Sequence, residues 1–369
     1  MKIAVCMIVG NEAKVIERCF NSFERYISAY IINANGTDRT AQIIKDYWAK
    51  RSVPGKIHTD AWQNFRDNRN LALEYGSKFI REELKEDPAK WYLLMVDADY
   101  VLNIDTTDWV NNLTLPNYSF RHTGYFDYAD CRLYRADKPW RYELVTHEFS
   151  HLPGENTTSN PIPGVTITHF CDGGHRSEKF ERDIRLITEE LKRDDIPRNH
   201  RVRYTFYLAR SYEDLGDYKN AAINYEKRVE FGGWEEETYY SLFKQGRCRA
   251  KTAKTLAQKM DAVKVLMNAY YYRPSRLEAI YEAAEFLVDW DFIQLALPLL
   301  KICLVTPYPK HDILMIHREV YEWKALYLYT RVTYILGLHE KSLYLHLCLQ
   351  NDKMPADHKQ LLKDKSGEN

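Results

Sequence analysis

Two short motifs in this chain combine residue types that can do chemistry. Asp97 and Asp99 end the apolar run WYLLMVDAD, and the stretch THEFSH places His147, Glu148 and His151 in the HExxH spacing of zinc peptidases. Two carboxylates at i and i+2 after a buried parallel strand are expected on one side of it, at the sheet edge where α/β proteins bind ligands. Carboxylate oxygens suit Mn²⁺ or Mg²⁺, which bind together with substrate phosphates. The first motif therefore predicts a site for a divalent cation and a diphosphate.

The second motif lacks the context that a zinc site needs. In a peptidase the HExxH residues lie on a helix, which brings both histidines to one face. Here Pro139 precedes the motif, Pro153 and Gly154 follow it, and YELVTHEF alternates apolar and polar residues as a strand does. In a strand the two histidines would lie about 13 Å apart, at ~3.3 Å per residue. The sequence therefore disfavours a zinc peptidase.

Composition sets broad limits on the class of protein. The 369 residues include 52 Lys and Arg and 52 Asp and Glu, so net charge favours neither nucleic acid nor acidic lipid as a partner. The N-terminal apolar run is too short for a signal peptide, and no run approaches the ~20 apolar residues of a membrane span. The 7 cysteines are odd in number and contain no CxxC pair, which is typical of reduced thiols. We expect a cytoplasmic protein without a transmembrane segment.

Short apolar runs alternate with amphipathic stretches through the first ~190 residues, which predicts βαβ units and a mostly parallel sheet with a mixed edge after residue 124. The expected strands are 3–9, 29–34, 56–62 and 91–99, and the expected helices are 11–26, 38–50, 66–85 and 177–193. Residues 150–164 contain three prolines and two glycines and are expected to form a loop. The α/β domain is placed at residues 1–195.

The rest of the chain has helical periodicity. The stretch FYLARSYEDLGDYKNAAINYEKRVEFGGW matches the tetratricopeptide (TPR) pattern of small residues at helix contacts, aromatics beside them and glycine at the turn. Two further pairs of stretches match this pattern more weakly: YYSLFKQGRCRA with AVKVLMNAYYYRP, and LEAIYEAAEFLVDW with ALPLLKICLVTPYP. We expect an all-α TPR-like repeat domain over residues 196–369, with residues 192–203 as a solvated linker.

Four stretches occur in an order that resembles a known family: CMIVGNEAKVIERCFNS, IINANGTDRT, NFRDNRNLAL and LLMVDADYVL. Together they resemble GT-A fold glycosyltransferases of the family 2 type. The later stretches PWRYELVTHEF and ITHFCDGGHRSEKFERDI, followed by helical repeats, are similar to a subgroup found in bacteria and large DNA viruses. The resemblance implies a Rossmann-like GT-A domain that moves a sugar, with inversion, from a nucleotide-diphosphate sugar to an acceptor hydroxyl.

The resemblance also implies roles for particular residues. Asp99, Asp97 and His169 would hold Mn²⁺ or Mg²⁺, Glu148 would deprotonate the acceptor, and His147 would orient it. Asn33 stands where the family has an aspartate that reads the nucleoside, although a UDP-sugar is the expected donor. The residues expected to contact the nucleotide and its diphosphate are Asn11, Glu12, Asn33, Asp38, Asp67, Arg69, Asp97, Arg176 and Lys179.

Some alternatives and partners stay open at this level. A sugar nucleotidyltransferase would use the same Asp-x-Asp, and a TPR-type binding scaffold would leave the GT-A domain degenerate. The expected acceptor is a glycan, a glycoprotein or a lipid-linked molecule, and the repeats could hold a protein partner. Trp140 and Trp234 are the best candidates for stacking on a sugar.

Overall fold

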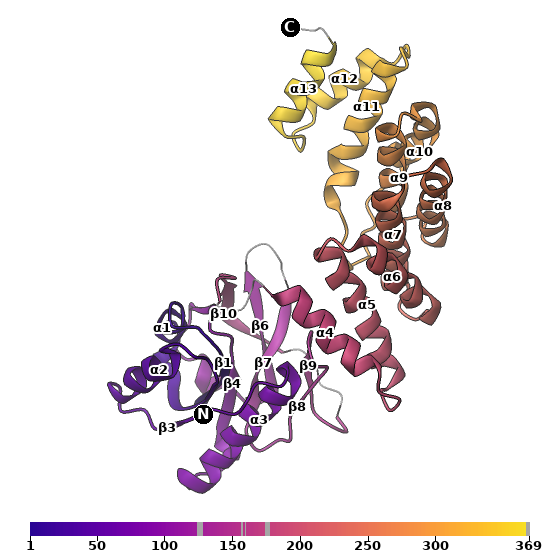
Figure 1. Cartoon of the computed structure of the whole chain (residues 1–369). Coiled ribbons are helices and arrows are strands. Elements are labelled where there is room, and N and C mark those ends of the chain that lie inside the picture. The colour runs from indigo at the N-terminus through magenta and orange to yellow at the C-terminus, as the bar shows by residue number, and fades with distance from the viewer. Residues whose placement is uncertain (124–127, 156–157, 159, 174–177, 367–369) are drawn as a thin grey trace. The chain divides into compact units, whose positions relative to one another are not determined.

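The computed structural model describes residues 1–123, 128–155, 158, 160–173 and 178–366. The chain divides into two compact units, Met1–Arg193 and Asp194–Asn369. The first combines strands and helices and the second is helical, as Figure 1 shows. The protein is therefore mixed α/β with a large helical part.

The strands of the first unit form one mixed sheet and one small hairpin. The order of the main sheet is β3-β2-β1-β4-β7-β6-β10-β5; β1 to β4 pair in parallel, whereas β7 runs antiparallel to both β4 and β6. The connection from Thr123 to Ala129 is too short for a helical crossover, so β6 and β7 pair antiparallel. The sheet is thus less parallel than the sequence predicts. The strands are β1 Lys2–Val9, β2 Ile27–Ala34, β3 Gly55–His58, β4 Trp91–Met95, β5 Tyr100–Ile104, β6 Asn117–Thr123, β7 Ala129–Arg135, β8 Arg141–Glu143, β9 Phe149–His151 and β10 Pro161–His169.

Alternate residues of β1 face two separate apolar cores, one on each side of the sheet. Val5 packs in the core that contains Phe20 and Trp48, and Cys6 packs in the core that contains Leu73. Helices therefore cover both faces. α1 Ile16–Asn21 and α2 Thr40–Ala49 pack on the first side, and α3 Phe65–Lys78, which continues as a π-helical turn Phe79–Glu83, packs on the second. Helix α4 Lys179–Leu191 follows β10 and contacts Thr146 of the β8–β9 turn through Asp183.

Several predicted boundaries are wrong for local reasons. The helix expected over 11–26 begins only at Ile16 and ends at Asn21, and the N–H groups of Glu12 and Ala13 before it donate to the side chains of Thr40 and Asp38 in the segment that follows β2. Both ends of the loop expected at 150–164 lie in strands, β9 and β10. The linker expected at 192–203 is helical from Arg198 onward.

The parallel strands place two loops in close contact at their carboxyl ends. Gly36 follows β2, and a Cβ atom there would lie 2.3 Å from the carbonyl oxygen of Gly10, which follows β1. Only glycine permits this approach. The loops after β1 and β2 are therefore held together beside the end of β4.

The second unit contains successive antiparallel helix pairs, which confirms the TPR-like repeat region. Ala209 and Ala221 are fully buried in its core, and Gly216 turns the chain between α5 and α6 with a φ of +84°. A Cβ on Gly246 of α7 would lie 2.7 Å from Cγ of Leu266 on α8, so glycine lets these helices approach closely. The helices are α5 Arg198–Asp214, α6 Tyr218–Phe231, α7 Glu235–Thr252, α8 Leu256–Tyr272, α9 Glu278–Asp289, α10 Ile293–Val305, α11 Ala325–Ile335, α12 Lys341–Gln350 and α13 Ala356–Ser366, with a π-helical turn Val320–Lys324 before α11. None of the helices in the described ranges is long and apolar enough to cross a membrane.

A buried carboxyl group in α9 makes the stability of this unit depend on pH. Burial raises the pKa of Glu282 from the ordinary 4.5 to about 7, although Arg247 and Lys244 act to lower it. The folded state then holds a proton that the unfolded state releases, so this group's contribution to stability falls as pH rises from about 4.5 to about 7. We expect Glu282→Gln to remove this dependence. Urea unfolding of both proteins across this pH range measures it; a constant difference between them would contradict the assignment.

Candidate active site

A cavity of about 620 Å³ lies in the first unit beside the carboxyl ends of the parallel strands. Residues from the loops after β1, β2 and β4 line it together with residues of α3, the β8–β9 turn and α4. This is where open α/β sheets bind ligands. The residues predicted from the sequence that line this cavity are Asn11, Glu12, Arg69, Asp97, Asp99, His147, Glu148, His169 and Lys179.

Asp99 and His169 form a pair in this cavity. Nε2 of His169 lies 3.0 Å from Oδ2 of Asp99, and the ring of His169 rests edge-on against Tyr100. The pairing follows from the sheet, because β10 runs antiparallel to β5 and places His169 opposite Tyr100. Phe170 N–H also donates to the Asp99 carbonyl. Two segments 70 residues apart thus present a carboxylate and an imidazole to one point.

The space beside this pair is kept open by Gly173. A Cβ atom on Gly173 would lie 3.3 Å from Oε2 of Glu12 and 3.5 Å from Oδ2 of Asp99, so a larger residue would fill the gap between the two carboxylates. Arg18 holds the chain next to Gly173 in place, because it donates two hydrogen bonds of 2.6 and 2.8 Å to Asp172. Asp99 and His169 are the side chains that could hold a divalent cation here.

Asp97 does not join this pair, contrary to the expected set of three metal ligands. Strand β4 ends at Met95, so the alternation that would hold Asp97 and Asp99 on one side no longer applies beyond it. Instead Oδ1 of Asp97 accepts from Arg69 at 2.7 Å, and Oδ2 lies 3.5 Å from Arg132. Within the described ranges no three His, Cys, Asp or Glu side chains are grouped to hold a metal ion.

Arg69 holds two of the predicted carboxylates at once. Its guanidinium donates to Asp97 through Nη2 and to Oε1 of Glu148 through Nε at 2.8 Å, while the side chain is 4% exposed. Burial acts to raise the pKa of Asp97, but Arg69 and Arg132 outweigh it and hold that pKa well below its usual range. Asp97 is therefore an ionised partner of two arginines.

The HExxH letters lie on a short hairpin and not on a helix. Strands β8 and β9 pair antiparallel, with Arg141 opposite His151, and His147 lies in the turn between them. His151 is 2.9 Å from Glu143, and His147 is 3.9 Å from Asp183, so the two histidines face different carboxylates. The zinc site of a peptidase is not formed.

Helix α4 contributes residues that the sequence did not single out. Asp183 is 1% exposed, accepts a 3.0 Å bond from Thr146 and lines the cavity beside Arg182. Burial raises the pKa of Asp183.

Arg132 of strand β7 also lines the cavity. It reaches this place because β7 lies beside β4 in the sheet. No spacing signal in the sequence marks Asp183 or Arg132.

Three predicted residues serve the frame of the site. Asn33 is 1% exposed and donates to Asp60 at 3.1 Å. Asp38 accepts from the backbone of Ala13 and Thr40. Asp67 accepts from Asn64 and Arg66 at the start of α3. None of the three is among the residues that line the cavity, and Arg176 lies outside the described residues.

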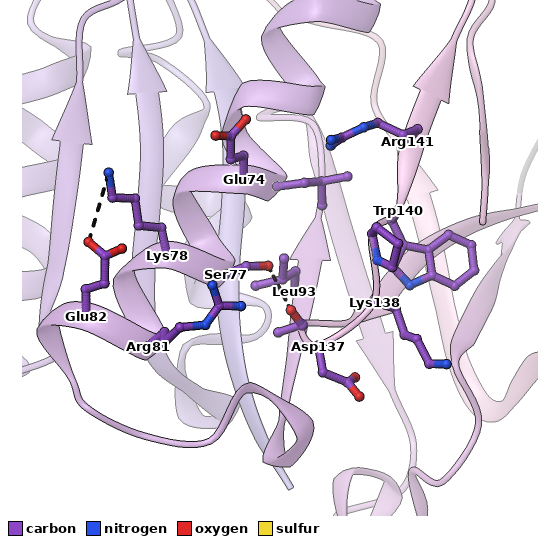
Figure 2. A pocket seen from close by; sticks show the side chains of 13 residues that line it. Glu74, Ser77, Lys78, Arg81, Glu82, Leu93, Asp137, Lys138, Trp140 and Arg141 are labelled. Atoms are coloured by element: carbon purple, nitrogen blue, oxygen red, sulfur yellow. Dashed lines mark hydrogen bonds and ion pairs between the residues drawn. The ribbon is translucent and has the colours of Figure 1, made fainter. Parts of the chain in front are cut away.

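A second cavity of about 400 Å³ lies between α3 and the segment that joins β7 to β8 (Figure 2). It shares no lining residue with the first cavity, and of the residues singled out in the sequence only Trp140 is among those that line it. Trp140 borders it, but the side chain is only 3% exposed and packs on Tyr134. The prediction that Trp140 stacks on a sugar is therefore wrong for this structure.

No known family model matches the chain, and no curated protein matches it. Among solved structures, MamA is 13% identical with a TM-score of 0.35, over 52% of this chain and 91% of that one. YrrB, described as a TPR protein with an unusual peptide-binding site, is 17% identical with a TM-score of 0.36, over 51% and 85%. A thermophilic TPR protein of Thermus thermophilus, TTC0263, is 15% identical with a TM-score of 0.34, over 52% and 92%.

Proposed function

We propose that this protein is an inverting glycosyltransferase that uses a divalent cation and a nucleotide-diphosphate sugar. The observation that carries the proposal is the convergence of Asp99, Glu148 and His169 on one cavity from the turn after β4, the β8–β9 turn and the end of β10. The GT-A resemblance of the motifs supports the same conclusion. A UDP-sugar is the proposed donor, and a hydroxyl of a glycan, protein or lipid is the proposed acceptor.

Sugar transfer requires positive charge to stabilise the leaving diphosphate and a base to take the proton of the acceptor hydroxyl. A cation held by Asp99 and His169 would supply positive charge to the diphosphate that leaves. Lys179 and Arg182, which also line the cavity, add charge for the same group. Glu148 accepts the proton of the acceptor hydroxyl, whose oxygen bonds to the anomeric carbon as the bond to the diphosphate breaks. Arg69 holds Glu148 in position through its 2.8 Å bond.

Calorimetric titration of the metal-stripped protein tests the donor site. UDP, GDP, dTDP and CDP are each added with and without Mn²⁺. We expect one diphosphate to bind tightly, and only when Mn²⁺ is present. Absence of binding for all four would contradict the proposed activity and would favour the helical repeats as the part to test next.

A binding scaffold is the second candidate, and the TPR-like stack of α5 to α10 favours it. Such a stack presents a surface for a protein or peptide and needs no chemistry in the other unit. A scaffold predicts partner binding that is unchanged when Asp99 and Glu148 are replaced. A transferase whose repeats hold the acceptor predicts loss of turnover under the same replacements.

A further inference from the structure

The cavity of the first unit has an aromatic wall that the proposed chemistry does not use. Trp62, which lies three residues before α3, and Phe65, which begins it, both line the cavity. We call these two residues the aromatic pair. Their rings meet edge-on, with centroids 5.8 Å apart and planes at 85°. An edge-on contact covers at most one face of each ring, so the half-buried Trp62 has a face left for another contact.

The aromatic pair lies beside the turn that carries the proposed base. The N–H of Phe65 donates to the carbonyl of Val145 at 3.1 Å, and Glu148 ends the same β8–β9 turn. A general base must come within hydrogen-bond reach of the hydroxyl whose proton it takes. The acceptor therefore binds on the side of the cavity that Glu148 and the aromatic pair share.

The two rings of the aromatic pair differ in what holds them. The guanidinium of Arg182 lies over the ring of Phe65, 4.9 Å from its centroid, and the main chain of Phe65 is tied to Val145. Phe65 is thus fixed between α4 and the β8–β9 turn. Trp62 precedes the helix and contacts Phe65 only at an edge, so it is the ring that a ligand can cover.

A sugar ring has the chemistry that this wall would bind. One face of a pyranose consists of C–H bonds that pack on an aromatic ring, and its rim carries hydroxyls that donate to carboxylates. Asp183 presents a carboxylate at the cavity wall, where it accepts the hydroxyl of Thr146 at 3.0 Å. A serine or threonine acceptor would bring a hydroxyl but no ring to Trp62. Aromatic and carboxylate groups in one cavity therefore favour a saccharide.

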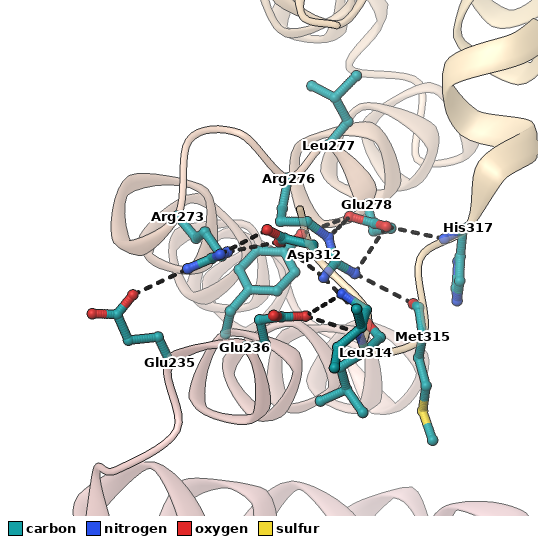
Figure 3. Close-up of polar contacts among 12 residues, drawn as sticks. Glu235, Glu236, Arg273, Arg276, Leu277, Glu278, Asp312, Leu314, Met315 and His317 are labelled. Carbon is teal, nitrogen blue, oxygen red and sulfur yellow. Dashed lines mark hydrogen bonds and ion pairs between the residues drawn. The ribbon is translucent and has the colours of Figure 1, made fainter. Parts of the chain in front are cut away.

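The charged groups of the helical repeats are, in contrast, used by the chain itself. Figure 3 shows Glu236 and Glu278 beside the segment that joins α10 to the next helices. Glu236 accepts the N–H groups of Ile313 and Leu314, both at 2.8 Å, and Glu278 accepts two bonds of 3.0 Å from Arg276. These contacts hold a connecting segment in place. The inference therefore concerns the cavity of the first unit alone.

We propose that Trp62 determines which acceptor binds, by stacking on the ring of a saccharide whose hydroxyl faces Glu148. The inference rests on the proposed transferase activity and narrows its acceptor from a glycan, a protein or a lipid to a sugar ring. Trp62 takes no proton in this scheme. It sets the affinity for the acceptor and leaves the binding of the nucleotide diphosphate unchanged.

Saturation-transfer difference NMR tests this role without turnover. The probes are the methyl glycosides of glucose, galactose, mannose and N-acetylglucosamine, each added to the full chain with Mn²⁺ and UDP. We expect at least one glycoside to be saturated on the C–H bonds of one ring face. Trp62→Ala should weaken its binding by about tenfold, the contribution of one aromatic contact, and Trp62→Phe should restore most of it. Gln63→Ala is the matched control, because Gln63 is the exposed neighbour and does not line the cavity.

Calorimetry of UDP with Mn²⁺ on the same proteins separates this inference from the proposed activity. If UDP binds but the wild type saturates no glycoside, or if Trp62→Ala binds the glycoside as the wild type does, the role of Trp62 is overturned and the transferase stands. A loss of UDP affinity in Trp62→Ala with unchanged glycoside binding would show that the ring stacks on the nucleobase, which also overturns the inference. If no diphosphate binds, the transferase fails, whereas glycoside binding that depends on Trp62 would still support the sugar subsite.

Discussion

Asp99→Ala is expected to abolish the Mn²⁺-dependent binding of a nucleotide diphosphate, with a loss of about 100-fold or more in affinity, because a direct ligand matters more than the outer-shell groups that cost 10–100-fold. Asp99 is one of the two protein ligands that the geometry offers, and its partner His169 lies 3.0 Å away. Alanine leaves His169 alone, and an imidazole by itself does not hold a hard divalent cation against water. Calorimetry with Mn²⁺ and the preferred diphosphate measures the loss.

Asp108→Ala is the control for this experiment. Asp108 is an exposed aspartate that follows β5 and does not line the cavity. The Asp108→Ala protein should therefore bind the diphosphate as tightly as the wild type. An Asp99→Ala protein that still bound the diphosphate with unchanged Mn²⁺ dependence would move the cation site away from Asp99.

Glu148→Gln is expected to lower turnover by about 10²–10⁴-fold, the usual contribution of a positioned general base. The amide oxygen of glutamine can still accept the bond from Arg69, so the cavity keeps its shape, but it cannot take the acceptor proton. Binding of Mn²⁺ and the diphosphate should change little. Turnover is followed as nucleotide diphosphate released from the donor with water as the acceptor.

Glu143→Gln is the matched control, since Glu143 lies on the same hairpin, pairs with His151 and does not line the cavity. Wild-type turnover in the Glu148→Gln protein would disprove the assignment of the base. Loss of diphosphate binding in that protein would instead show that Glu148 supports the nucleotide.

The periodic parts of the fold could be predicted from the sequence. Apolar runs marked β1, β2 and β4, and small residues at helix contacts such as Ala209 marked the TPR-like pairs. The mixed half of the sheet could not be predicted in detail, because β5 pairs with β10 across more than 60 residues. Nor does local pattern show that the N–H of Glu12 donates to the side chain of Thr40, 28 residues further along the chain.

The sequence motifs and the ends of the strands predict which residues gather at the candidate site. They do not predict the direction in which each side chain points. The resemblance to glycosyltransferases placed Asp99 and His169 in one site, and the structure pairs them. It also placed Asp97 with them, but two arginines draw that carboxylate away. The position of Arg132 depends on where β7 inserts in the sheet, which no residue spacing encodes.

The guanidinium of Arg69 pairs with both Asp97 and Glu148, so the effects of substitutions at these two positions depend on each other. One buried cation neutralises part of both carboxylates, so removal of either leaves the other with a stronger hold on the same arginine. Substitutions at these two positions should therefore be strongly epistatic. In homologous chains we expect the three residues to covary as a unit, so that a lineage that loses one of them loses or replaces the other two.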